Sequence, residues 1–227
     1  MSAFSERRLQ LQADLVAQGR AVLELSTASV ECYFTHDQDK ARSVIETDDQ
    51  IDQVDVNIER QSIPLLAMGE KGEFEIRSIL TIVKVNNELE RIADCAVNIA
   101  EFVVAHERPT ERIPPTFRVM ANSVLGMVRD AVKALDTGDS EVARQVLLFD
   151  DTVDRFKGEI LLHAQEQVAL GAFGVRFAFK LTGVTRSLER MADHCTNIAE
   201  QLIYLHSGKI VRHRPEGWSE PQAPIAH

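Results

Sequence analysis

Residues 89–101 have the sequence LERIADCAVNIAE, and residues 188–200 have the sequence LERMADHCTNIAE. Nine of the thirteen aligned positions are identical, at a constant offset of 99 residues. Identity at this level and at a fixed offset indicates an internal duplication. The fold is therefore expected to contain one structural unit twice.

A second matched pair of motifs lies upstream of the first. Residues 48–52 are DDQID and residues 150–154 are DDTVD, at an offset of 102. The three-residue difference between the two offsets belongs in the loop between the helices that carry the motifs. Each copy thus has two acidic motifs on two successive elements.

Polar and helix-breaking residues divide the chain into six long segments with apolar residues at helical spacing. The breaks lie at residues 36–39, 69–72, 108–115, 137–139, 171–174 and 207–208. In one segment, seven apolar residues share a face at 100° per residue: Leu89, Ile92, Ala93, Ala96, Ile99, Ala100 and Val103. Short connections between long helices favour antiparallel neighbours.

These patterns predict an all-α fold of two tandem three-helix bundles related by internal duplication. Residues 1–108 form the first bundle and residues 114–207 the second. Residues 208–227 contain three prolines and lack apolar periodicity, so we expect a mostly disordered tail.

Composition narrows the functional class. The formal net charge of −10 argues against a nucleic-acid partner, because such a surface repels phosphate backbones. The three cysteines, Cys32, Cys95 and Cys195, are odd in number and form no Cys-x-x-Cys motif, which fits a reducing compartment. No signal peptide or membrane-spanning run is evident, so a cytoplasmic location is expected.

The repeated acids form stripes on their helices. Glu90 and Asp94 are four residues apart and lie on one face, which Asn98 and Glu101 continue beside the apolar face. Carboxylates at this spacing repel each other by a few tenths of a kcal/mol. Oxygen ligands from two adjacent helices suit a hard cation, or iron or manganese. The alternative is a solvated acidic face in an acidic protein.

No motif of enzyme chemistry accompanies these stripes. The chain has no Glu-x-x-His pair of a di-iron bundle, no glycine-rich phosphate loop and no nucleophile motif. Arg91 follows a motif glutamate, as Arg190 does in the second copy. Arg91 is expected either to pair with Glu88 or to contact a partner.

The phrase LERIAD-x-x-x-NIAE, which recurs as LERMAD-x-x-x-NIAE in the second copy, resembles the PhoU family, accessory proteins of the bacterial phosphate-specific transport system. The resemblance covers the chain from about residue 5 to 206. It implies two three-helix bundles whose acidic motifs can hold multinuclear iron, or sometimes zinc. The matching residues are Asp48, Asp52, Glu90, Asp94, Asp150, Asp154, Glu189 and Asp193.

The resemblance also implies a function and partners. It implies a non-enzymatic negative regulator of phosphate uptake and of phosphate-starvation signalling. Such a protein docks on the ATPase subunit of the phosphate ABC transporter and on a sensor histidine kinase. It would be a homodimer that meets the membrane only through its partners. The expected contact residues are Arg91, Asn98, Glu101, Arg190, Asn197 and Glu200.

The chain departs from the family at the start of the third helix of each repeat. The family often has Pro-x-x-Asp-Leu-Arg there, whereas this chain has Glu-Ile-Arg at residues 75–77 and Gly-Val-Arg at residues 174–176. One alternative is therefore a metal-binding helical adaptor for another phosphate transporter. A metal-dependent hydrolase built on the carboxylates is the other.

Overall fold

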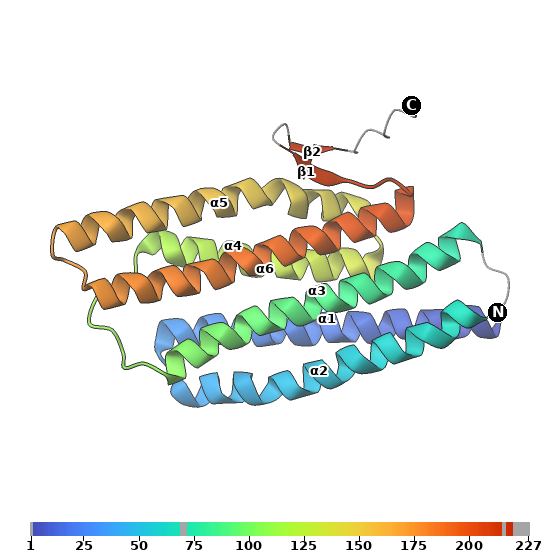
Figure 1. Cartoon of the computed structure of the whole chain (residues 1–227), viewed down its shortest axis with the longest axis horizontal. Helices are drawn as coiled ribbons and strands as arrows, with labels where there is room; N and C mark the ends of the chain where they lie inside the picture. The colour runs from blue at the N-terminus through green and yellow to red at the C-terminus, as the bar shows by residue number, and fades with distance from the viewer. Residues whose placement is uncertain (1, 69–71, 215–216, 220–227) are drawn as a thin grey trace, which may run out of the picture.

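A computed structural model describes residues 2–68, 72–214 and 217–219 of the chain. Within these ranges it contains six long helices and two three-residue strands, so the predicted all-α fold is confirmed (Figure 1). The helices are α1 (Ala3–Thr35), α2 (Gln38–Ala67), α3 (Glu73–Val104), α4 (Pro115–Thr137), α5 (Ser140–Ala169) and α6 (Val175–Ser207). None of these described helices is both long and apolar enough to cross a membrane.

The duplication is visible in the turns that join the first two helices of each repeat. Asp37 caps α2, where its side chain accepts hydrogen bonds from two backbone N–H groups of the first turn, and Asp139 caps α5 in the same way. The residue before each cap is left-handed: His36 has φ 55° and Gly138 has φ 67°. Both pairs of residues are related by the offset of 102.

The six helices form two bundles packed along one seam. Helices α1 to α3 contact one another, as do α4 to α6, and the bundles meet where α3 lies on α6 and α1 on α4 (Figure 1). Helices α2 and α5 lie on the outside. At the α1–α4 contact, a Cβ added to Gly19 would lie 3.2 Å from a methyl group of Val132, so the two helices approach closely there.

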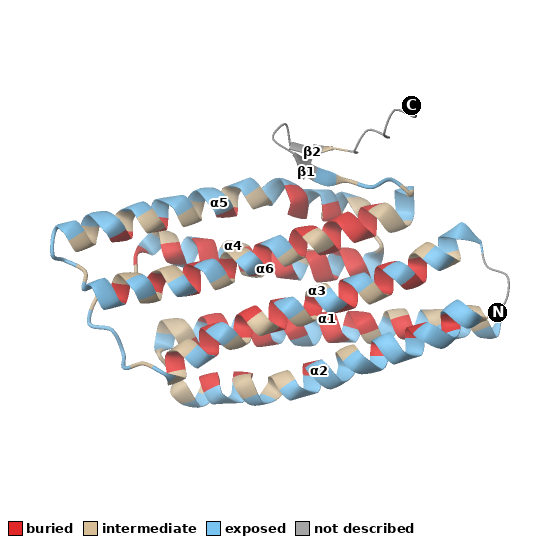
Figure 2. Ribbon diagram, in the orientation of Figure 1, coloured by how far each residue is buried: buried red, intermediate tan, exposed pale blue. Residues whose placement is uncertain are grey.

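The core follows the inner helices, while the outward faces of α2 and α5 are largely exposed (Figure 2). All seven residues of the predicted apolar face on α3 are buried, each no more than 1% exposed: Leu89, Ile92, Ala93, Ala96, Ile99, Ala100 and Val103. Because α3 packs on α1 and α2 and also on α6, only a narrow strip of its surface remains for polar residues.

The expectation of a mostly disordered tail is corrected for its described part. Strand β1 (Arg212–Arg214) pairs antiparallel with β2 (Gly217–Ser219), while residues 220–227 lie outside the described residues. The tail is attached to the second bundle because Arg212 forms an ion pair with Glu200 of α6 and Val211 packs against the core. A hairpin this short has no apolar periodicity that sequence analysis could detect.

Burial predicts the effect of truncating a core leucine. Leu89→Ala should lower the free energy of unfolding by about 3 kcal/mol, because the lost side chain is fully buried and leaves a cavity. The matched control Leu148→Ala, at a residue 72% exposed, should change it by less than about 0.5 kcal/mol. Denaturant titration of both variants measures the difference, and equal effects would contradict the assigned core.

Candidate functional site

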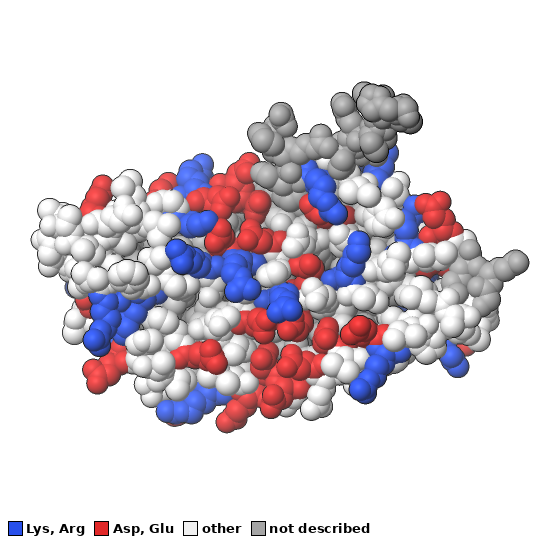
Figure 3. Space-filling view, in the orientation of Figure 1, with Lys and Arg blue, Asp and Glu red and all other residues white. Residues whose placement is uncertain are grey.

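Acidic side chains of α2 and α3 gather in a first acidic cluster, as the sequence predicted. It contains Asp48, Asp52, Asp55, Glu90 and Asp94, and the space-filling view shows a dense group of acidic atoms over these helices (Figure 3). Burial, followed by the charges of Asp52 and Asp94, raises the pKa of Asp48 to about 6, with smaller effects from Asp49 and Glu101. The carboxylates of the two helices therefore act on one another.

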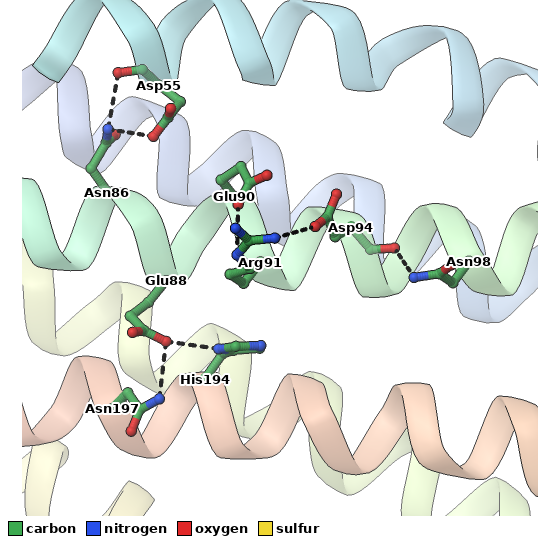
Figure 4. A network of polar contacts seen from close by, with 9 residues as sticks. All are labelled: Asp55, Asn86, Glu88, Glu90, Arg91, Asp94, Asn98, His194 and Asn197. Carbon is green, nitrogen blue, oxygen red and sulfur yellow. Dashed lines mark hydrogen bonds and ion pairs between the residues drawn. The ribbon is translucent and has the colours of Figure 1, made fainter. Parts of the chain in front are cut away.

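Asp55 belongs to the first cluster but was missed in the sequence. Asn86 of α3 donates its side-chain N–H to Asp55 Oδ1 at 2.6 Å and to the Asp55 carbonyl at 3.0 Å (Figure 4). Burial raises the pKa of Asp55, with contributions from Glu59 and Asp52. A comparison of the two copies could not find it, because the equivalent residue of the second copy is Lys157 rather than an acid.

Arg91 lies at the rim of the first cluster and not on Glu88, so one of the two expectations for it is corrected. Its guanidinium is 3.3 Å from a carboxylate oxygen of Glu90 and 3.1 Å from one of Asp94 (Figure 4). Burial raises the pKa of Glu90, the Asp94 charge raises it further, and Arg91 opposes both effects. Arg91 therefore partly neutralises two carboxylates of its own helix.

Glu88 is directed at the other bundle. Its Oε2 accepts hydrogen bonds from Asn197 Nδ2 at 3.0 Å and lies 2.7 Å from His194 Nδ1, so it joins α3 to α6 (Figure 4). Glu88 does not pair with Arg91, because its carboxylate is directed across the seam at His194 and Asn197 of α6. The side chains of Glu88 and His194 are both less than one-fifth exposed.

A second acidic cluster lies at the equivalent place on α5 and α6. Its members are Asp150, Asp154, Glu189 and Asp193. Burial raises the pKa of Asp193, and Glu189 and Asp154 raise it further, whereas His194 and Lys157 oppose the rise. Lys157 of α5 forms an ion pair with Glu189 and lies 4.0 Å from Asp154. The second cluster therefore contains its own cation.

The residues expected to contact partners differ in exposure. Arg91, Asn98, Glu101 and Arg190 are exposed, and Asn98 donates to the Asp94 carbonyl at 2.7 Å. Asn197 is half-buried in the contact with Glu88, and Glu200 is 7% exposed and paired with Arg212. The exposed members of the set thus lie mainly on α3.

The clusters are not arranged as a finished metal centre or a catalytic pocket. Among the described residues, no three His, Cys, Asp or Glu side chains are placed to hold a metal ion as they stand. A cavity of about 440 Å³ lies between α5 and α6, but its walls include Leu161, Phe179 and Arg186 and none of the clustered acids. The acids therefore form a charged surface.

The three cysteines carry no reactive chemistry. All are free and buried. Burial raises the pKa of Cys32 and of Cys95 to about 11, and it also raises the pKa of Cys195. Thiols with such pKa values stay protonated at neutral pH, so these residues pack as small apolar side chains.

Two tandem three-helix bundles, each with an acidic cluster on its second and third helices, define a repeat-built helical scaffold. A family model, the PhoU domain, matches residues 15–103 and 117–202 of the chain. The chain belongs to the PhoU family. The two matched ranges correspond to the two bundles.

Individual relatives match over most of their length. The chain is 32% identical over 211 residues to the phosphate-specific transport system accessory protein PhoU homolog 1 of Thermotoga maritima, covering 92% of this chain and 91% of that protein. It is 32% identical to the PhoU homolog of Aquifex aeolicus, covering 94% and 97%.

Solved structures have the same fold. The crystal structure of PhoU from Pseudomonas aeruginosa superposes with a TM-score of 0.81 at 30% identity, covering 90% of this chain and 99% of that chain. The crystal structure of the phosphate transport system regulatory protein PhoU from Streptococcus pneumoniae gives a TM-score of 0.85 at 22% identity, covering 92% and 99%.

The raised pKa of Asp48 predicts a pH-dependent stability difference. The folded state holds the Asp48 proton up to about pH 6, whereas the unfolded chain releases it near the ordinary value of 3.8. Ionisation therefore reduces stability as pH rises through this window. Asp48→Asn should unfold with a free energy about 1 kcal/mol higher than wild type at neutral pH, after allowance for solvent screening, and with no difference near pH 4.

Denaturant titrations of chelator-treated protein at the two pH values provide the measurement. The control Asp151→Asn removes an exposed carboxylate on α5, the helix of the second bundle that corresponds to α2. A stability difference for Asp48→Asn that is larger at pH 4 than at pH 7 would contradict the assigned environment of Asp48.

Proposed function

We propose that this chain is a non-enzymatic regulator of phosphate uptake and of the linked phosphate-starvation response. Family membership supports the phosphate role, since the relatives are named phosphate-specific transport system accessory proteins. The chain docks on the ATPase subunit of a phosphate ABC transporter and on a sensor histidine kinase. When phosphate is plentiful, this complex keeps the kinase from activating its response regulator. The active form is a homodimer.

The observation that carries the proposal is the rigid presentation of a repeated charged surface. Glu90, Arg91 and Asp94 lie on the exposed strip of α3, and the equivalent residues lie on α6. Burial raises the pKa of the Cys95 thiol, while Arg190 and Arg91 both act to lower it, so both guanidiniums lie beside this part of α3. Long packed helices hold such groups at fixed positions, which suits a docking scaffold.

A multivalent metal ion is part of this proposal for the first acidic cluster. The donor set fits iron, because Asp48 and Asp52 of α2 face Glu90 and Asp94 of α3 and supply hard oxygen ligands. Zinc also accepts carboxylate oxygens as ligands. These four residues would hold the metal. The bound cation would neutralise carboxylates that now repel one another and would join α2 to α3.

A hydrolase is not favoured by any feature of the site. An enzyme of that class needs a concave and partly dry pocket around its metal ligands. Glu101 and Asp52 are exposed, and the acids lie on the outer side of the helices (Figure 3).

Arg190 provides the most direct test of docking. It is exposed and makes no ion pair with the described residues, so its removal leaves the fold intact. Arg190→Ala should weaken binding to the transporter ATPase or the kinase by more than about tenfold, because arginines at docking surfaces often contribute strongly to affinity. The matched control is Arg144→Ala, which removes an exposed arginine of α5 that pairs with Glu141.

The experiment expresses each variant in the host lacking the wild-type gene. With Arg190→Ala, a phosphate-starvation reporter should be active in rich phosphate and the partner subunits should no longer co-purify, whereas Arg144→Ala should behave as wild type. If deletion of the whole gene leaves the reporter silent in rich phosphate, and no transporter or kinase subunit co-purifies with wild type, the regulatory proposal fails.

A further inference from the structure

Positions 55 and 157 are equivalent in the two repeats but have opposite charges. The offset of 102 that relates Asp48 to Asp150 and Asp52 to Asp154 also relates Asp55 to Lys157. The first cluster therefore has five carboxylates, and the second has four carboxylates and an ammonium group. The two clusters thus match in their other acidic residues but have side chains of opposite charge at this one position.

The Lys157 ammonium lies between the two helices of the second cluster. It comes from α5, hydrogen-bonds to Glu189 of α6, and lies 4.0 Å from Asp154 on its own helix. The hydrogen bond to Glu189 is the largest effect on the pKa of Lys157 and raises it, and the charges of Glu189, Asp154 and Asp193 add to the rise. The group therefore stays charged at neutral pH and satisfies acids of both helices.

An ammonium in this place does what a bound metal ion would do. It joins α5 to α6 electrostatically and reduces the repulsion among the acids. Glu189 is one of the residues expected to bind a metal ion here. A metal ion at this point would therefore have to displace Lys157 from Glu189. The residues of the second cluster consequently do not fit the metal that the family implies.

We propose that Lys157 is the resident cation of the second acidic cluster and that multivalent metal binds only to the first. The inference uses the metal role proposed above for the first cluster as its reference. It does not depend on the docking role.

A second cation pairs with a repeated acid of the same bundle, further along α6. Arg212 of the tail hairpin pairs with Glu200, whose side chain is almost fully covered. The equivalent acid of the first repeat, Glu101, is exposed and has no ion pair among the described residues. Glu189 and Glu200 of the second bundle thus pair with cations from outside their helix, whereas Glu101 is exposed and Glu90 pairs with Arg91 of its own helix.

Arg91 of the first cluster does not link the two helices of its cluster as Lys157 does. Arg91 contacts Glu90 and Asp94, which belong to its own helix, and it forms no ion pair with α2 among the described residues. Its side chain is 48% exposed, so it can turn into solvent when a metal ion enters. The space between α2 and α3 therefore keeps its carboxylate ligands.

The test counts metal ions per chain in full-length protein. Chelator-treated protein is incubated with Zn²⁺ or, without oxygen, with Fe²⁺, freed of unbound metal, and analysed by elemental mass spectrometry. Wild type should lose its bound metal with Asp94→Asn and keep it with Asp193→Asn. Lys157→Asp, which restores the chemistry of the first repeat, should raise bound metal about twofold, and Asp193→Asn should abolish the gain.

Three further variants make the test specific. Lys157→Met removes the ammonium without adding an acid and should also raise bound metal, which covers the case in which Lys157→Asp folds poorly. Asp55→Lys should abolish metal binding in the first bundle. Lys133→Asp makes the same charge change on an exposed face of α4 and should leave metal content unchanged.

The possible results separate this inference from the proposals above. Equal loss of metal with Asp94→Asn and Asp193→Asn would overturn the role of Lys157. Unchanged metal content in both Lys157 variants would overturn it as well. If wild type binds no metal but Lys157→Asp gains a site that needs Asp193, the role of Lys157 stands and the metal proposal for the first cluster fails.

Discussion

The packing of α3 against α6 is the contact on which the remaining structure depends. It joins the bundles through buried apolar residues, and Glu88 adds hydrogen bonds to His194 and Asn197 across the seam. Because α3 is also covered by α1 and α2, its polar residues are confined to one strip. That confinement places Glu90 and Asp94 beside the acids of α2 and forces like charges together.

Duplication explains why the arrangement occurs twice, and divergence explains why the two clusters are not equal. In the second bundle an internal lysine offsets the repulsion among the acids. Among the described residues of the first bundle, only Arg91, at the rim, does so, and Asp48 and Asp55 have raised pKa values. Matched backbones thus carry sites with different electrostatics, and the difference depends on single side chains.

Much of this fold could be predicted from the sequence because its signals are local and repeated. Helical periodicity located the buried face of α3, and the two offsets paired the acidic motifs correctly. Side-chain partners were harder to predict. Spacing alone allowed Arg91 to pair with Glu88, but Glu88 is drawn to α6 by partners more than 100 residues away in the chain. Lys157 and Asp55 were not predicted as site residues, because a search for positions identical in the two copies finds only the shared residues. Positions 55 and 157 are equivalent but differ in residue type.

The two clusters have a common origin, and we propose that the first is open to a metal ion while Lys157 closes the second. X-ray anomalous scattering from crystals grown with Zn²⁺ tests it most directly, because the signal locates the metal. We expect anomalous density between α2 and α3, against Asp52, Glu90 and Asp94, and none beside Lys157. Density between α5 and α6, with Lys157 displaced from Glu189, would contradict it.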